Sequence, residues 1–288
     1  MKTFSIVGAG RLGTSLAAAL ARRGWQLEVI VDREARAARE SRRILGQGRT
    51  STALAAAAKA RGAVIIAVPD GAVGRVASAL ARSDASWTGR NVFHTSGLLP
   101  SAILAPLAGR GARVASLHPV QAFPRKDMPA SIFEGITWGL EGDAAAVTAA
   151  EKIVRALRGN VLLLSAKDKP AYHAACALAS NALIALEWTA ARVLGRAGVP
   201  EEDAFGTLLP LVQGTLQNVK SFGLKKAVTG PVLRGDVATV KKHLEALRGD
   251  AGARRVYAVL GRQLLRLATM KDLPAGRVRA LKRLLEGK

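Results

Sequence analysis

Three glycines near the N-terminus have the spacing of a phosphate-binding loop; they are Gly8, Gly10 and Gly13. They follow an apolar run at 4–7 and precede an alanine-rich, helix-favouring segment at 16–22. Between a strand and a helix, such glycines permit the turn, let the backbone approach a pyrophosphate and allow close packing of the helix. The helix start adds free N–H groups and a positive dipole end. The pattern predicts a dinucleotide site that includes Arg11 and Leu12; a glycine-rich turn without a ligand is the alternative.

A carboxylate and an arginine are both candidates to contact the ribose of that dinucleotide. The predicted second strand, 26–31, ends in Asp32 and Arg33, about twenty residues after the glycines, where the ribose-reading residue lies in such folds. Asp32 would accept from the free 2′-hydroxyl of NAD. Arg33, with Arg36 and Arg11 nearby, would pair with the 2′-phosphate of NADP. Three cations against one carboxylate favour NADP and leave NAD open, since Arg36 fits a solvated helix face equally well.

Two later strand ends are expected to border the cofactor, because ligands bind at the carboxyl ends of the strands in open α/β sheets. The apolar runs 63–68 and 91–94 predict such strands. The residues at their ends that we assign to the cofactor site are Val68, Pro69, Thr95 and Ser96. Asp70 fits better as the N-cap of a helix at 72–82.

Histidines supply the acid–base chemistry that a reaction at this site would need. His118 follows a predicted strand at 113–116, is held by Pro119, and has the near-neutral pKa that suits proton transfer. A histidine that merely ends the strand is the alternative. Pro170 fits the first turn of a helix predicted to run to about 197. Its small and polar stripe includes His173, Ser180 and Asn181, which would hold a substrate or, alternatively, bond within a helix interface.

The order of elements predicts an α/β Rossmann fold with a doubly wound, mostly parallel sheet, followed by a smaller all-α domain. Strand and helix patterns alternate as far as residue 166, and only helical patterns follow. We therefore predict a dinucleotide-binding domain at 1–166 and a helical substrate or dimerisation domain at 167–288. In the latter, Pro200 opens a helix to about 222, and Asp236 is the expected N-cap of a helix ending near 247.

Composition excludes several other classes of protein. The 288 residues carry a net charge of +22, yet the cations are spread along the chain and only 4% of residues are aromatic. This pattern makes specific nucleic-acid binding an unlikely function and suits steering of anionic ligands. A single cysteine, Cys176, fits a reducing cytoplasm and a buried, inert thiol. Neither a signal peptide nor a membrane span is expected, and the apolar segment 171–194 reads as a buried helix.

Several motifs together resemble a bacterial family that pairs a Rossmann-like domain with a helical C-terminal domain of unknown function. The resemblance spans nearly the whole chain. The motifs are Gly8-Ala-Gly-Arg-Leu-Gly, Ala67-Val-Pro-Asp, His94-Thr-Ser-Gly, Leu117-His-Pro-Val-Gln-Ala-Phe, Ala179-Ser-Asn-Ala-Leu and Val228-Thr-Gly-Pro-Val-Leu-Arg-Gly-Asp. More distantly the layout is similar to pyrroline-5-carboxylate reductase, prephenate dehydrogenase, ketopantoate reductase and the coenzyme-F420-dependent NADP reductase.

The resemblance implies roles for individual residues. The similar His-Pro segment of prephenate dehydrogenases supplies a catalytic histidine, which corresponds to His118. Ketopantoate reductases use a lysine and an asparagine one turn apart; Asn181 matches, but Ala177 stands in place of the lysine, so His173 or Lys169 would have to substitute.

Together these observations predict an NADP(H)-dependent oxidoreductase that reduces a small carboxylate-bearing carbonyl, 2-dehydropantoate first among them, or an imine. His118 or His173 would donate the proton, and Ser180 and Asn181 would orient the substrate, with Arg234 and Lys225 as weaker candidates for charge pairing. A cytoplasmic homodimer without a metal is expected. A non-catalytic nucleotide sensor or scaffold, or a basic nucleic-acid-associated protein, are the alternatives.

Overall fold

The computed structural model describes residues 2–269 and 273–287, which form two compact units, Met1–Leu178 and Ala179–Lys288. The first unit is built on an eight-stranded sheet in the order β3-β2-β1-β4-β5-β6-β7-β8. The strands are β1 (Thr3–Val7), β2 (Gln26–Val31), β3 (Arg49–Ser51), β4 (Ala63–Ile66), β5 (Asn91–His94), β6 (Arg113–Pro119), β7 (Thr137–Gly142) and β8 (Asn160–Leu163). Neighbouring strands are parallel except β6 and β7. The predicted doubly wound, mostly parallel sheet is confirmed.

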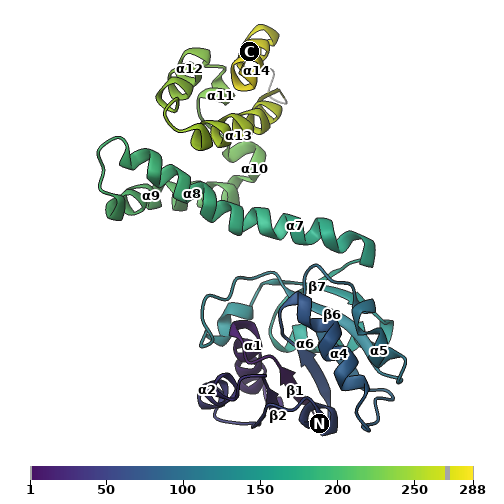
Figure 1. Cartoon of the computed structure of the whole chain (residues 1–288). Coiled ribbons are helices and arrows are strands. Elements are labelled where there is room, and N and C mark those ends of the chain that lie inside the picture. The colour runs from purple at the N-terminus through teal and green to yellow at the C-terminus, as the bar shows by residue number, and fades with distance from the viewer. Residues whose placement is uncertain (1, 270–272, 288) are drawn as a thin grey trace. The chain divides into compact units, whose positions relative to one another are not determined.

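Helices cover both faces of this sheet (Figure 1). The helices of the first unit are α1 (Arg11–Arg22), α2 (Ala35–Leu45), α3 (Ala55–Lys59), α4 (Asp70–Ala81), α5 (Ala105–Ala108), α6 (Ala144–Ala156) and α7 (Lys169–Ala179), with short 3-10 turns at Ser101–Leu104, Ala130–Phe133 and Ala166–Asp168. One core joins side chains of α1, α2 and α6 to Phe4 and Ile6 of β1. A second core joins α3, α4 and α5 to Val7 of β1 and Val64 and Ile66 of β4. Because both faces are buried, the central strands are apolar along their length.

The second unit is helical throughout its described residues, as predicted. Its helices are α8 (Asn181–Gly195), α9 (Glu201–Phe222), α10 (Leu224–Ala227), α11 (Pro231–Arg234), α12 (Val237–Ala246), α13 (Ala251–Thr269) and α14 (Ala275–Glu286). Its core is formed by Val232, Val240, Leu244, Leu265, Leu281 and Leu285. Asp236 caps α12 as predicted, since its carboxylate accepts from the Thr239 N–H at 3.0 Å.

Several boundaries differ from the sequence-based prediction. β3 was not predicted: its three residues, Arg-Thr-Ser, form a short edge strand without an apolar pattern. The helix predicted at 170–197 is two helices, α7 and α8, separated at Ser180. The first unit extends to Leu178, rather than ending at 166, because α7 packs on it through the fully buried Lys169.

The segment 171–194 is not the buried helix that its apolar composition predicts. None of its residues is buried, and Cys176 is half-buried. The helical stretch Ala166–Gly195 is long and apolar enough to cross a membrane, with a mean hydropathy of 1.3 over its best window. One such helix is weak evidence for a membrane span, and this one carries His173 and Lys169 near its start. The large apolar side chains that this segment leaves exposed are Leu178, Ile184 and Trp188.

Candidate cofactor and active site

The three glycines of the loop differ in what a side chain at each position would contact. Gly8 has φ +108°, and a Cβ there would lie 2.3 Å from the Ala67 carbonyl oxygen. A Cβ at Gly13 would lie 2.1 Å from the Gly8 carbonyl oxygen. A Cβ at Gly10 would meet nothing within 4 Å. Gly8 and Gly13 are therefore required by the fold itself, whereas Gly10 leaves open space at the start of α1.

That open space lies at a helix end suited to an anion. Gly10 is the N-cap of α1 and offers no side-chain hydrogen bond. The first N–H groups of a helix have no partner within the helix, so those of α1 are available to a phosphate. The loop therefore fits the pyrophosphate of a dinucleotide, which Gly10, Arg11, Leu12 and Gly13 would hold through their backbone.

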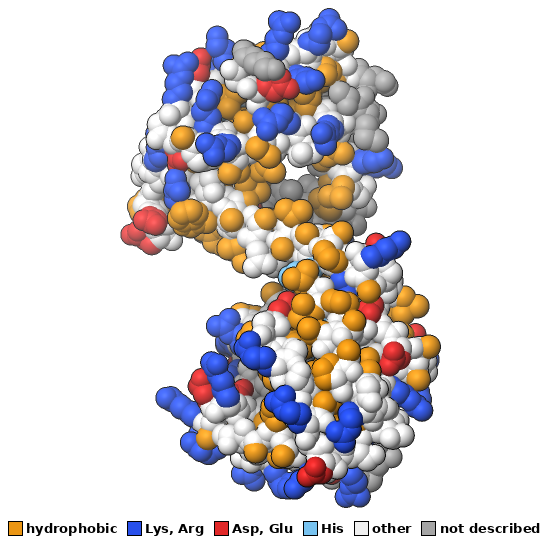
Figure 2. Space-filling model, turned by 45° about the vertical axis from the view of Figure 1, so that its right-hand side comes forward, with side chains coloured by type: hydrophobic (Ala, Val, Ile, Leu, Met, Phe, Trp, Pro, Cys, Tyr) orange, Lys and Arg blue, Asp and Glu red, His pale blue; other side chains and the backbone are white. Residues whose placement is uncertain are grey.

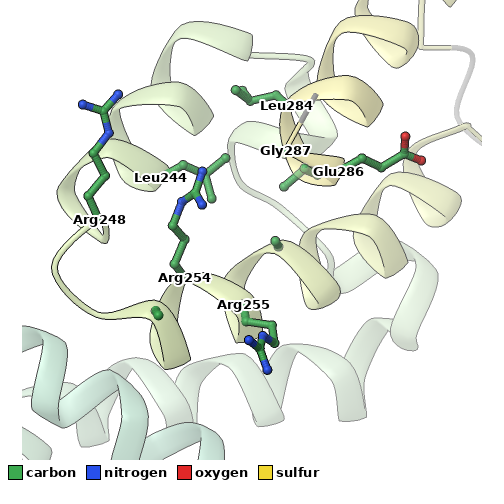
Figure 3. Close-up of a pocket in the computed structure, with 10 residues that line it drawn as sticks. Leu244, Arg248, Arg254, Arg255, Leu284, Glu286 and Gly287 are labelled. Carbon is green, nitrogen blue, oxygen red and sulfur yellow. The ribbon is translucent and has the colours of Figure 1, made fainter.

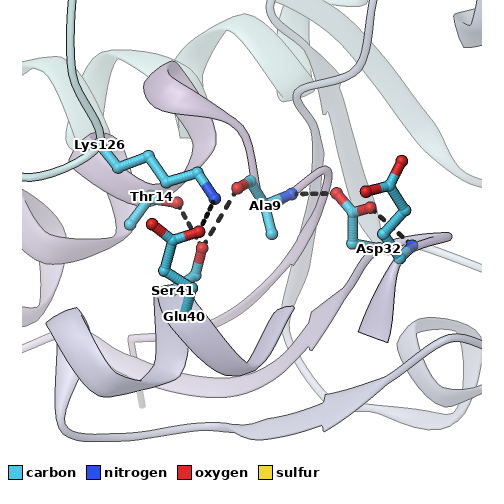
Figure 4. Close-up of polar contacts among 7 residues, drawn as sticks. Ala9, Thr14, Asp32, Glu40, Ser41 and Lys126 are labelled. Atoms are coloured by element: carbon cyan, nitrogen blue, oxygen red, sulfur yellow. Dashed lines mark hydrogen bonds and ion pairs between the residues drawn. The ribbon is translucent and has the colours of Figure 1, made fainter. Parts of the chain in front are cut away.

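Asp32 braces the glycine loop from the end of β2 (Figure 4). One carboxylate oxygen accepts from the Ala9 N–H at 2.8 Å, and the other accepts from the Glu34 N–H at 3.0 Å. On the other side of Ala9, the Ser41 hydroxyl donates to its carbonyl oxygen at 3.2 Å and lies 2.7 Å from the Thr14 hydroxyl. The Asp32 carboxylate is thus already engaged by backbone donors.

The segment after β6 is fastened over the same helix. The Lys126 ammonium pairs with Glu40 of α2 at 2.7 Å (Figure 4). The Lys126 carbonyl oxygen accepts a hydrogen bond from the Ser15 hydroxyl of α1 at 3.0 Å. By contrast, the side chain of Arg33 is 90% exposed, and Arg11 and Arg36 are exposed as well. Arg33 pairs with Glu34 at 3.6 Å, but both side chains are largely exposed, so this ion pair is weak and all three guanidinium groups can still reach a phosphate.

A pocket of about 260 Å³ in the first unit brings four of the predicted cofactor residues, Leu12, Val68, Thr95 and Ser96, together with His118 and His173. Its lining comes from the glycine-loop helix, the ends of β4, β5 and β6, and α7. The lining residues are Leu12, Ala67, Val68, Asp70, Thr95, Ser96, Gly97, His118, Pro119, Gln121, Phe123 and His173. Asp70 is not the N-cap of α4, as the sequence suggested; Pro69 is, and Asp70 begins the helix.

The two histidines lie against each other at one side of this pocket. Their ring centroids are 6.0 Å apart with planes at 75°, and His118 Nδ1 lies 2.7 Å from the Tyr172 hydroxyl. Gly97 packs against both rings: a Cβ there would lie 2.7 Å from His173 Cδ2 and 2.9 Å from His118 Nε2. Only glycine leaves room for this arrangement, and it sets the Nε2 edge of His118 beside the Ser96–Gly97 turn that also lines the pocket.

The environment keeps His118 neutral. Burial lowers the pKa of His118 to about 4, and the neighbouring His173 and Lys169 act in the same direction. Burial likewise lowers the pKa of His94, which lies beneath the pocket, to about 4. Burial raises the pKa of Tyr172, so its hydroxyl stays protonated. At neutral pH the His118–Tyr172 pair is therefore uncharged, and the imidazole can serve as a hydrogen-bonding group.

Sequence reasoning missed several residues of this site. Tyr172 and Gly97 were not singled out, and Lys169 was named only as a possible substitute for an absent lysine. The signal for Tyr172 was available, since it precedes His173 on the same helix. Ser180 and Asn181 lie in the second unit, between α7 and α8 and at the first position of α8. Their assignment to the substrate stays a prediction.

A second cavity, of about 330 Å³, lies in the second unit among α12, α13 and α14. It is bordered by Arg248, Arg254 and Arg255, which could suggest an anion site. Figure 3 shows that the guanidinium groups of Arg248 and Arg255 point away from each other, so the three cations do not converge. This cavity therefore lacks the geometry of a phosphate site.

Comparison with known proteins matches two family models to the chain, and the boundary between them lies inside the first compact unit. Residues 2–119 match the model of a Rossmann-like domain, and residues 136–264 match a domain of unknown function, DUF2520. The chain is thus similar to a Rossmann-like domain in its N-terminal part and to a DUF2520 domain in its C-terminal part, as the resemblance of its motifs implied. No curated protein matches the sequence.

Solved structures share the fold over most of the chain. Protein TM1727 of Thermotoga maritima is 26% identical, with a TM-score of 0.73 over 94% of this chain and 100% of that one. A reductive aminase of Aspergillus terreus, solved with NADPH and ethyl-5-oxohexanoate, is 19% identical, with a TM-score of 0.68 over 94% and 99%. A pyrroline-5-carboxylate reductase of Coxiella burnetii is 18% identical, with a TM-score of 0.60 over 98% and 97%. The two enzymes show the fold alone at these identities.

Proposed function

From a chain that pairs a Rossmann-like domain with a DUF2520 domain, we propose an NADPH-dependent reductase of a small carbonyl or imine. The observation that carries the proposal is the single pocket in which Leu12 of the glycine-loop helix lies with His118 and His173. Enzymes with the same fold, the reductive aminase and the pyrroline-5-carboxylate reductase, support the reaction class. The bound nicotinamide would supply the hydride, and the chain would supply position and the proton.

Residues of the chain would supply the hydrogen bond, the proton and the orientation of the substrate. His118, uncharged and oriented by Tyr172, would donate an Nε2–H hydrogen bond to the carbonyl oxygen or imine nitrogen. His173, facing the same pocket, would transfer the proton that this atom takes up as the neighbouring carbon accepts the hydride. Thr95 and Ser96 would border the nicotinamide end. Ser180 and Asn181 remain the proposed substrate-orienting groups.

The cofactor is proposed to be NADPH rather than NADH. Asp32 already accepts two backbone N–H groups, while Arg33, Arg36 and Arg11 are exposed. A 2′-phosphate would pair with those guanidinium groups, whereas a 2′-hydroxyl would compete for an engaged carboxylate. The NADPH bound in the reductive aminase structure agrees with this preference.

The substrate proposal extends to a compound bearing a carboxylate, with 2-dehydropantoate as the first compound to assay. Of the described residues that line the pocket, none is a lysine or arginine. A carboxylate would therefore have to pair with a cation outside this lining, and a neutral ketone or cyclic imine needs no such partner. A panel should contain all three kinds of compound.

The test is direct. Binding of NADPH and NADH is measured by fluorescence titration, and oxidation of NADPH is followed with 2-oxo acids, neutral ketones and cyclic imines. We expect NADPH to bind at least tenfold more tightly than NADH and at least one class of compound to be reduced. A protein that binds neither dinucleotide contradicts the proposal; one that binds NADPH but reduces nothing supports the sensor alternative.

The second unit supports a homodimer. It leaves large apolar side chains half or more exposed; these are Ile184, Trp188, Leu211, Leu216, Phe222 and Leu224. Figure 2 shows apolar side chains gathered on one face of this unit, while cations are scattered over both units. Apolar surface of this kind marks an association surface. With a single cysteine in the chain, a cytoplasmic location remains the proposal.

A further inference from the structure

A lysine lies beneath the histidine pair, and the proposed reaction gives it no task. Lys169, the first residue of α7, is fully buried. Its Nζ donates to the Ser116 hydroxyl at 2.6 Å and to the Ser96 carbonyl oxygen at 3.3 Å. A buried ammonium is costly unless it is hydrogen-bonded and compensated, so a residue placed in this way has a specific structural consequence.

The contacts of Lys169 continue into the turn that lines the pocket. The Ser116 hydroxyl donates its only hydrogen to the Ser96 carbonyl oxygen at 3.1 Å, so it accepts the bond from Lys169. Ser96 in turn donates its N–H to His94 Nδ1 at 3.2 Å and accepts the Leu99 N–H on its hydroxyl at 2.9 Å. Every one of these contacts holds the backbone around Ser96 in place.

The Ser96–Gly97 turn packs directly against the rings of both histidines. Gly97 follows Ser96, and a Cβ at this position would overlap both His118 and His173. Any shift of the turn would therefore move the two rings or open a gap beneath them. The position of Ser96, which Lys169 anchors, sets the geometry of the histidine pair.

We propose that Lys169 is a positioning residue for the proposed reductase site: its ammonium holds the Ser96–Gly97 turn against the two histidines. The positive charge of Lys169 adds to burial and to His173 in lowering the pKa of His118. His118 then serves as the hydrogen-bonding member of the pair, and His173 carries the proton. Lys169 itself is not among the residues that line the pocket.

The charged and titratable groups around the pair agree with this assignment. From α7, His118 faces Lys169, Tyr172 and His173; from β5 it faces His94. Two carboxylates raise the pKa of Lys169; they are Glu141 of β7 and Asp70 of α4. Burial lowers the pKa of Lys169, and these carboxylates oppose that effect. They favour the charged lysine on which the proposal depends.

The test replaces the charge and follows the histidines directly. Lys169→Met removes the ammonium at similar length, Lys169→Arg keeps the charge, and Lys167→Met is the control at an exposed lysine two positions earlier. The chain has four histidines, so their Cε1–H resonances can be assigned and titrated by NMR. We expect His118 to titrate at about pH 4 in the wild type, and its midpoint to rise in Lys169→Met only.

Two results would overturn the proposal: a wild-type His118 that titrates near its ordinary value, or a folded Lys169→Met protein with an unchanged midpoint. If Lys169→Met does not fold, the proposal is judged on two other results. The titration midpoint of His118 must be low in the wild type, and it must stay low in Lys169→Arg. The proposal rests on the proposed reductase function, so NADPH affinity is measured on the same proteins. Failure of the wild type to bind NADPH would contradict that function, whereas the titration tests Lys169 independently.

Discussion

The proposed mechanism gives His118 and His173 two different tasks, which a single histidine usually combines. His118 is fixed by Tyr172 and kept neutral by its surroundings, so it is suited to a hydrogen bond rather than to release of a proton. His173 lines the same pocket, and within the part of the chain that the structure describes its ring makes no such hydrogen bond. Proton transfer by a positioned side chain contributes about 10²- to 10⁴-fold to a rate. This division therefore predicts unequal effects of removing each ring.

We expect His173→Gln to lower kcat by about 10²-fold or more while leaving the Kd for NADPH within about twofold, because the ring acts only on the reacting atom. Stopped-flow measurement of NADPH oxidation with the best substrate of the panel gives the rate. His243→Gln is the matched control, since His243 lies in α12 and bonds to Tyr257 instead. An unchanged kcat in His173→Gln would remove this residue from the mechanism.

Acid lability is a second consequence at the residue scale. Burial lowers the pKa of His94 and of His118 to about 4, below the ordinary 6.5 that an unfolded chain has. The unfolded state thus binds more protons between these values, so this contribution to stability is full above about pH 6.5 and is lost as the pH falls toward 4. Each proton contributes a slope of about 1.4 kcal/mol per pH unit.

Urea unfolding at pH 7 and at pH 5 measures this slope. We expect the free energy of unfolding of the wild type to fall over this range, and His118→Asn to reduce the fall by about half because one of the two buried groups is gone. His243→Gln should leave the fall unchanged. Equal falls in the wild type and His118→Asn would show that His118 titrates normally in the folded protein.

At the scale of elements, the glycine loop separates what the fold needs from what the cofactor needs. A Cβ at Gly13 would meet backbone at 2.1 Å, whereas a Cβ at Gly10 would meet open space. We expect Gly10→Ala to keep the wild-type melting temperature within about 2 °C and to weaken NADPH binding by about tenfold or more, since the methyl group would occupy the pyrophosphate position. Gly13→Ala should instead lower the melting temperature.

Differential scanning fluorimetry with and without NADPH measures both quantities on one sample. Gly71→Ala is the control, because a Cβ at this position in α4 also meets nothing within 4 Å. If Gly10→Ala bound NADPH as tightly as the wild type, no phosphate would lie over this loop, and the glycine motif would be a feature of the turn alone.

The sequence predicts elements well where a local pattern specifies them. The alternation of apolar strands and helices predicted the doubly wound sheet, and the Gly8-x-Gly-x-x-Gly spacing predicted the strand–turn–helix unit. β3 was missed because Arg49, Thr50 and Ser51 pair through backbone at a sheet edge and need no apolar side chains. The break between α7 and α8 at Ser180 could not be predicted, because no glycine or proline lies there.

The site is less predictable than the elements, for the same reason. The neighbours of His118 come from β5 and α7, far apart in sequence, so Tyr172 and Lys169 could not be placed beside it from spacing alone. A lysine in a polar stretch also looks like a solvated residue. Its burial follows only from the way α7 packs on the sheet.

For the whole molecule, charge and apolar surface point to different partners. The net charge of the chain is +22, and on the face that Figure 2 shows the cations are scattered over both units rather than gathered in one stripe. The apolar surface, in contrast, is concentrated on the second unit. A membrane could cover such a surface, but the exposed side chains come from three separate helices, α8, α9 and α10, and we propose that a second copy of the chain covers them.

We therefore expect the protein, purified without detergent, to elute as a dimer with twice the chain mass of 30.1 kDa. Ile184 and Trp188 lie one turn apart on α8 and are 69% and 59% exposed. Replacing both with glutamate would place two charges in the proposed interface and should yield monomers that remain folded by circular dichroism, because neither side chain supports the core of the unit. Lys152→Glu, on the exposed side of α6, is the control for a charge change and should leave the dimer intact. Light scattering coupled to size exclusion distinguishes these states, and a monomeric wild type would show that the apolar surface has another partner.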